Sequence, residues 1–140
     1  MADQGPAVTI TELDRAECER LLASHQVGRL AVLNDGKLHI VPVNYATPGG
    51  GVIVFRTDPG TILTEASLRD VAFEVDEIDA EARLGWSVAV HGFGWDIADA
   101  IDPESVRLRT LPLATWAPGD RQQWFKIIPA KVTGRRLSPR

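Results

Sequence analysis

The stretch from residue 38 to residue 63, LHIVPVNYATPGGGVIVFRTDPGTIL, constrains the fold of this chain more than any other. Its two apolar segments, 37–45 and 52–57, are predicted as strands that a glycine-rich turn joins. The second strand ends in Arg56 and Thr57, and a Pro-Gly turn and a predicted helix over 61–68 follow. A guanidinium and a hydroxyl beside a helix start can bind an anion such as a phosphate. A surface arginine at a strand end would show the same pattern, so both interpretations stand.

The pattern outside this stretch is also that of strands. From Val27 the apolar residues recur with a period of two, and Asn34-Asp35-Gly36 is a strong hairpin signal. Pro42 lies inside a predicted strand, which places it at an edge, at a bulge or where a ligand approaches the backbone. The predicted strands are 27–33, 37–45, 52–57, 71–75, 86–98 and 122–135, the last bulged at Pro129.

Helices contribute little to the predicted fold. One is expected over 12–24 with Thr11 as its N-cap, and a short one over 103–108 with Pro103 at its first position. The acidic segment 76–85 is expected to be an exposed loop. Six short strands with hairpin turns therefore predict a mainly β fold, a closed or nearly closed antiparallel barrel.

The size and charge of the chain exclude several classes of protein. Its 140 residues fit one domain, expected over 11–140 behind a flexible lead-in at 1–10. A net charge of −4 argues against generic binding to nucleic acid or to an anionic membrane. The single cysteine, the lack of a signal peptide and the lack of a long apolar run favour a soluble cytoplasmic protein.

No constellation of catalytic side chains stands out. The three histidines are far apart and show no metal-ligand spacing, so no metal site is expected. Nucleophile elbows and the glycine-rich nucleotide motifs are absent from the sequence. Arg29, inside an apolar strand, requires either a paired carboxylate or a ligand anion. An enzyme of this kind would need a cofactor that brings its own reactivity.

Five segments in order carry a resemblance to a known family. They are VGRLAVLNDGKLHIVPVNYA, VIVFRTDPGTIL, VAFEVDEID, GWSVAVHG and WFKIIPAKVTGRRL. Together they resemble the pyridoxamine 5'-phosphate oxidase-like, FMN-binding split-barrel family, in its small actinobacterial type. The similarity covers about residues 10 to 137. It implies a six-stranded split barrel and a homodimer with two FMN sites at the dimer interface.

The resemblance also implies site residues and a function. The strand formed by Val41, Pro42, Val43 and Asn44 would lie along the flavin ring. Arg56 and Thr57 would hold the phosphate, with Thr61 nearby. Trp86 and Ser87 would lie at the edge of the site, and Trp124 would approach from the partner subunit. The implied function is a flavin-dependent oxidoreductase that acts on a small-molecule substrate or electron donor. The alternative is a non-enzymatic protein that binds a flavin, a deazaflavin or another small ligand.

One residue departs from the pattern of the family. Relatives commonly carry a lysine that helps to bind the phosphate at the position of Ile62. Losing one charge-assisted contact costs about 1.5–3 kcal/mol, roughly ten- to a hundredfold in affinity. Three expectations therefore remain open for the site: weakly bound FMN, a deazaflavin as used by related split barrels, or no cofactor.

Overall fold

The structure is a computed structural model that describes residues 7–58, 60–61, 63 and 66–140. Its described part contains seven strands and two helices of six or more residues. The strands are β1 (Val8–Glu12), β2 (Val27–Asn34), β3 (Lys37–Gly49), β4 (Val52–Thr57), β5 (Ser67–Asp79), β6 (Leu84–Asp96) and β7 (Gln123–Pro139), and the helices are α1 (Arg15–Ala23) and α3 (Pro103–Leu108).

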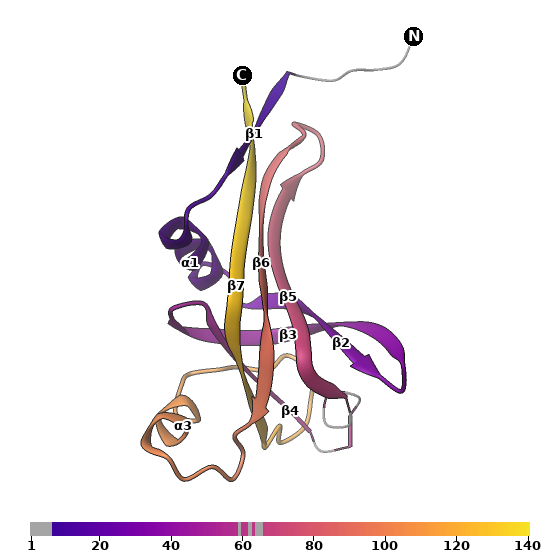
Figure 1. Cartoon of the computed structure of the whole chain (residues 1–140), viewed down its shortest axis with the longest axis vertical. Helices are drawn as coiled ribbons and strands as arrows, with labels where there is room; N and C mark the ends of the chain where they lie inside the picture. Colours follow the sequence, from indigo (N-terminus) through magenta and orange to yellow (C-terminus); the bar gives the residue numbers. More distant parts are fainter. Residues whose placement is uncertain (1–6, 59, 62, 64–65) are drawn as a thin grey trace.

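Six of the strands close into an antiparallel ring (Figure 1). The order is β7–β4–β3–β2–β5–β6, and β6 also pairs with β7. The seventh strand, β1, pairs with the C-terminal end of β7, so that Val8 lies opposite Pro139. The prediction of six strands was therefore one too few, and residues 8–10 belong to the sheet rather than to a flexible lead-in. The physical reason is the length of β7, which extends beyond the ring and offers a free edge.

The turns and bulges explain where the chain reverses and bends. Asp35 and Gly36 have φ values of 52° and 72°, so the predicted Asn-Asp-Gly hairpin is confirmed. The register between β6 and β7 shifts where His91 faces Lys131 and Gly92 faces Pro129, which confirms the bulge predicted near Pro129. The acidic segment 76–85 was predicted as a loop, but most of it belongs to β5 and β6, which continue as a long hairpin.

Helix α1 begins later than predicted. Thr11 and Glu12 pair with β7, so Thr11 cannot cap the helix. The N-cap is Asp14, whose side chain accepts a hydrogen bond of 2.8 Å from the backbone N–H of Glu17. Helix α3 begins at Pro103, as predicted. The predicted helix over 61–68 falls partly outside the described residues, and Ser67 and Leu68 open β5 instead.

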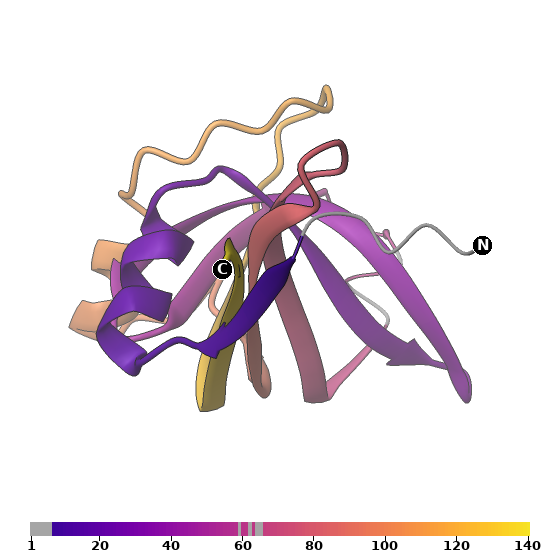
Figure 2. The same ribbon diagram turned by 90° about the horizontal axis from the view of Figure 1, so that it is seen from above.

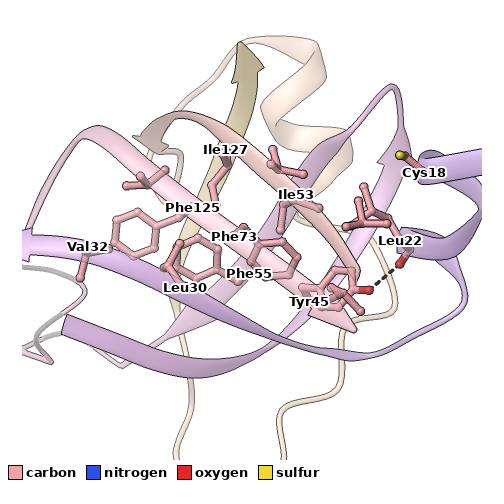
Figure 3. Close-up of a cluster of buried hydrophobic side chains, with 14 of the residues drawn as sticks. Cys18, Leu22, Leu30, Val32, Tyr45, Ile53, Phe55, Phe73, Phe125 and Ile127 are labelled. Atoms are coloured by element: carbon pink, nitrogen blue, oxygen red, sulfur yellow. Dashed lines mark hydrogen bonds between the residues drawn. The ribbon is translucent and has the colours of Figure 1, made fainter. Parts of the chain in front are cut away.

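Two hydrophobic cores hold these elements together. The larger fills the ring and includes Leu30, Phe55, Phe73 and Phe125 (Figure 3). The aromatic side chain of Phe73 packs directly on Gly28: a Cβ atom added to Gly28 would lie 2.2 Å from Cζ of Phe73. The smaller core lies between the strands and α3, and is formed by Val54, Ile97, Leu108, Leu113 and Trp124.

Both helices lie on one side of the barrel (Figure 2). The β2–β3 hairpin projects on the opposite side. Helix α1 is fastened to the ring by the Tyr45 hydroxyl, which donates a 2.5 Å hydrogen bond to the carbonyl oxygen of Leu22 (Figure 3). In the described part of the chain no helix is long and apolar enough to cross a membrane.

Candidate functional site

A small cavity lies between the middle of β3, the end of β4 and the segment that connects α3 with β7. Its volume is about 90 Å³. The residues that line it are Pro42, Val43, Asn44, Arg56, Thr57, Leu63, Thr115, Ala117 and Arg121. The structure thus brings together five of the residues that the sequence analysis selected, from two strands that are adjacent in the sheet.

Beside this cavity β3 has an unpaired edge. The strand pairs with β2 over residues 37–44, but its pairing with β4 begins only at Tyr45. Among the residues that the structure describes, no strand pairs with the second edge of residues 38–43. Backbone donors and acceptors along this edge can therefore bind a flat, polar ring. Pro42 lies in this stretch, at an edge, which is one of the places predicted for it.

Arg56 is held by the connecting segment. Its Nε and Nη2 atoms both donate to the carbonyl oxygen of Leu113, at 3.1 and 2.7 Å. Its guanidinium carbon also lies 5.3 Å from the centre of the Trp124 ring, within cation–π range. Two of its three nitrogens are therefore engaged within the protein, and the residue fixes the position of the segment from 109 to 122.

Thr57 is the buried polar residue of the cavity. It is only 3% exposed. Its hydroxyl oxygen lies 3.3 Å from the hydroxyl oxygen of Thr61, and it accepts a 3.3 Å hydrogen bond from Nη1 of Arg121. These contacts link Thr57, Thr61 and Arg121, of which Thr57 and Arg121 line the cavity.

Arg121 is a residue of this cavity that the sequence analysis missed. Its Nη2 atom donates to the carbonyl oxygen of Pro118 at 3.1 Å, and its backbone N–H donates to Oδ1 of Asp58 at 2.6 Å. Its Nε atom is buried and has no hydrogen-bond acceptor among the described residues. Arg121 is 64 residues from Thr57 and belongs to no local motif, so only the fold brings them together.

The connecting segment also contacts β3 at Asn44. The backbone N–H of Trp116 donates to Oδ1 of Asn44 at 2.8 Å. The indole of Trp116 is 71% exposed, between two residues that line the cavity, Thr115 and Ala117. Sequence reasoning gave Trp116 no more weight than the other tryptophans.

Five of the predicted site residues do not line this cavity. One of them is Thr61, whose hydroxyl oxygen nevertheless lies 3.3 Å from that of Thr57. Val41 packs against the larger core. Trp86 packs edge-on against His25 at 5.0 Å, and Ser87 borders a separate cavity of about 490 Å³ on β6 and β7. Trp124 is 8% exposed and belongs to the smaller core, and its indole lies over the guanidinium group of Arg56 of its own chain. Its approach to the site of a partner subunit stays a prediction.

Arg29 finds its partner within the sheet. Its Nη1 atom lies 3.3 Å from Oε1 of Glu74 and 3.1 Å from Oδ2 of Asp76. Of the two alternatives left open by the sequence, the paired carboxylate is the one observed. Burial, together with the hydrogen bond and charge of Asp76, raises the pKa of Glu74 to about 7, and Arg29 opposes this shift only in part. Within the described ranges, no cluster of His, Cys, Asp and Glu could hold a metal ion.

Comparisons with known proteins agree on one family. The pyridoxamine 5'-phosphate oxidase family model matches residues 14–136. The uncharacterized protein Rv0080 of Mycobacterium tuberculosis is 35% identical over an alignment of 133 residues, which covers 91% of this chain and 86% of that protein.

Solved structures show the same fold. A FAD-binding protein from Mycobacterium smegmatis is 30% identical, with a TM-score of 0.68 over 93% of this chain and 100% of that one. A FAD-binding protein from Mesorhizobium loti is 26% identical, with a TM-score of 0.72 over 94% of this chain and 99% of that one. The chain described here therefore belongs to the pyridoxamine 5'-phosphate oxidase family and has its split-barrel fold.

Proposed function

We propose that this protein binds a flavin, FMN in the first instance, and uses it as an oxidoreductase. The observation that carries the proposal is the junction of two features. The unpaired edge of β3 can bind the polar edge of a ring system, and the adjoining cavity presents Arg56, Thr57 and Arg121 to an anion. The FAD-binding relatives support a flavin rather than another phosphate-bearing ligand.

The side chains present fit a phosphate group. Two guanidinium groups and a buried hydroxyl converge on the cavity, and the buried Nε of Arg121 has no acceptor among the described residues. Arg56, Thr57 and Arg121, with Thr61 nearby, would surround the phosphate. The backbone of Val41, Pro42, Val43 and Asn44 would lie along the ring. Ser87 and Trp86 would stay at the far edge of the site.

The site requires a second copy of the chain. A cavity of about 90 Å³ cannot enclose a flavin, since pockets for ligands of this size hold roughly 300–1,000 Å³. Next to Pro42 on β3, Leu38 and Ile40 are 80% and 73% exposed. Their cross-strand neighbours, Leu33 and Ala31, continue this apolar surface on β2. We infer that a homodimer covers this surface and closes the cofactor site.

The chemistry would come from the cofactor. When bound, a flavin would supply the capacity for hydride and electron transfer between a reduced substrate or donor and an acceptor. The protein would bind the phosphate, orient the ring against β3 and exclude water at the dimer interface. The notable feature of the cavity lining is the lack of an acid–base side chain, since none of its described residues is a His, Asp, Glu or Lys.

That lining also favours a second candidate, a flavin carrier or sensor without catalytic activity.

Purified protein should show the visible absorption of a flavin or gain it on titration with FMN. A reduced nicotinamide should then bleach the bound flavin if the protein is an oxidoreductase. Tight binding without reduction by any electron donor would instead support the carrier, and a deazaflavin titrated in parallel tests the alternative cofactor.

A further inference from the structure

We propose that Arg121 binds the anionic group of the ligand directly, and that Arg56 acts mainly by holding in place the segment that carries it. This inference rests on the proposed function, which puts a phosphate in the cavity. It assigns the main positive charge of the site to a residue outside the β3–β4 stretch.

The first observation concerns the free donor. The Arg121 side chain is 18% exposed, and its buried Nε–H has no hydrogen-bond acceptor among the described residues. The carboxylate of Asp58 is near, but its Oδ2 atom is 3.8 Å from Nε, beyond hydrogen-bond distance. A buried donor without an acceptor costs free energy unless a ligand or water completes it. Arg121 also lines the cavity, so a phosphate bound there would lie against its side chain.

The second observation concerns the backbone around Arg121. Its φ is 53°, a left-handed conformation that is unfavourable for residues other than glycine. Two residues earlier, Gly119 has φ 122°, and a Cβ there would lie 2.1 Å from Oδ2 of Asp58. The chain is thus wrapped tightly around the Asp58 carboxylate, with the Arg121 guanidinium held over Thr57. Backbone strain of this kind concentrates at ligand sites.

The third observation is the contrast with Arg56. The Nε and Nη2 atoms of Arg56 both donate hydrogen bonds to the carbonyl oxygen of Leu113, and its guanidinium group lies over the indole of Trp124. Leu113 is itself buried in the smaller core. Arg56 therefore links β4 to the connecting segment, so its loss would displace Arg121 as well as remove a charge.

An alternative is that Arg121 only stabilises its loop through Asp58 and Pro118. The two roles differ in what they predict for ligands with and without a phosphate. An anion-binding residue strengthens the binding of FMN but not of riboflavin, which has the same ring and no phosphate. A residue that only shapes the loop affects both ligands alike.

The test is a titration of FMN and of riboflavin, followed by flavin fluorescence, on wild type and three variants. Arg121→Ala removes the guanidinium. Arg121→Gly also removes the guanidinium, but glycine adopts the positive φ of residue 121 without strain. The hydrogen bond from the backbone N–H of residue 121 to Asp58 is kept, so the loop should retain its shape. Arg107→Ala removes an exposed arginine of α3 and serves as the matched control.

We expect both Arg121 variants to lose about ten- to a hundredfold in FMN affinity, the effect of one charge-assisted contact, and to keep riboflavin affinity within about twofold. The control should bind both flavins as wild type does. Unchanged FMN affinity, or an equal loss for both flavins, would overturn the assignment while leaving the proposed function intact. If wild type binds neither flavin, the proposed function fails, and the assignment fails with it.

Discussion

The guanidinium of Arg56 donates two hydrogen bonds to the carbonyl oxygen of Leu113, 57 residues further along the chain. This contact ties the end of β4 to the segment between α3 and β7. The same segment carries Arg121 into the cavity and places Trp116 beside Asn44. The cavity therefore depends on a link between distant parts of the sequence.

Replacing Arg56 by alanine should weaken the binding of FMN and of riboflavin together, with the FMN affinity falling by more than about tenfold. The reason is that the segment 109–122 loses its attachment at Leu113. Limited proteolysis should also cut this segment faster than in wild type. If FMN affinity does not change, the phosphate lies elsewhere.

The site shows how far the sequence could lead. Arg56 and Thr57 were selected because they end a predicted strand beside a helix start, and residues 42–44 were selected through the resemblance to the family; the structure brings both sets to one cavity. Arg121 could not be found in this way, since its approach to Thr57 depends on the path of an irregular segment after α3. Ile62, the departure noted in the sequence, lies outside the described residues, so its effect stays a prediction.

The fold was more accessible to sequence reasoning than the site. Turn chemistry at Asp35-Gly36 and the bulge at Pro129 are local properties, and both were confirmed. The strand β1 was missed because Val8–Glu12 becomes a strand only through pairing with the far end of β7. The length of β5 was missed because the acidic residues from Asp76 onward suggested a loop, whereas Asp76 forms an ion pair with Arg29 on the neighbouring strand.

Replacing Gly28 by alanine should destabilise the barrel by roughly 1–3 kcal/mol, the usual cost of overpacking a core. A Cβ would lie 2.2 Å from Cζ of Phe73, whose ring is fully buried and packs edge-on against Tyr45. Urea denaturation measures the loss. Shortening the neighbour in the double variant Gly28→Ala/Phe73→Leu should cost less than the sum of the two single changes, and strict additivity would contradict the proposed clash.

The stability of the protein should depend on Glu74 as the pH changes. The pKa of this carboxyl is about 7 in the folded protein, against an ordinary value of 4.5. Between these values the folded state binds a proton that the unfolded state has lost, so raising the pH from about 5 to 8 lowers stability. The variant Glu74→Gln lacks this titration.

Thermal unfolding at several pH values measures the effect. The melting temperature of Glu74→Gln relative to wild type should rise steadily as the pH increases from about 5 to 8. A constant difference over this range would show that Glu74 titrates normally. The comparison holds even if the variant loses its ion pair with Arg29. That loss changes the melting temperature by a similar amount at every pH and leaves the slope of melting temperature against pH unchanged.

Placing a charge on the exposed apolar surface of β3 should prevent dimer formation. Leu38→Asp puts a carboxylate in the proposed interface, where burial of an unpaired charge is unfavourable. Light scattering should give twice the 15.3 kDa mass of one chain for wild type, and the mass of a single chain for the variant. Ile101→Asp, at an exposed residue just before α3, is the control and should remain dimeric. A monomeric wild type at micromolar concentration would refute the dimer.

The central claim, that the open edge of β3 and the adjoining cavity bind a flavin through its phosphate, is tested most directly by titrating the purified wild-type protein with FMN. Flavin fluorescence reports binding, with riboflavin, FAD and a deazaflavin titrated in parallel. The account predicts that FMN binds at about micromolar concentration or tighter, and more tightly than riboflavin, because FMN carries a phosphate for the cavity lined by Arg56, Thr57 and Arg121 and riboflavin carries none. Failure of all four compounds to bind at micromolar concentration would contradict it.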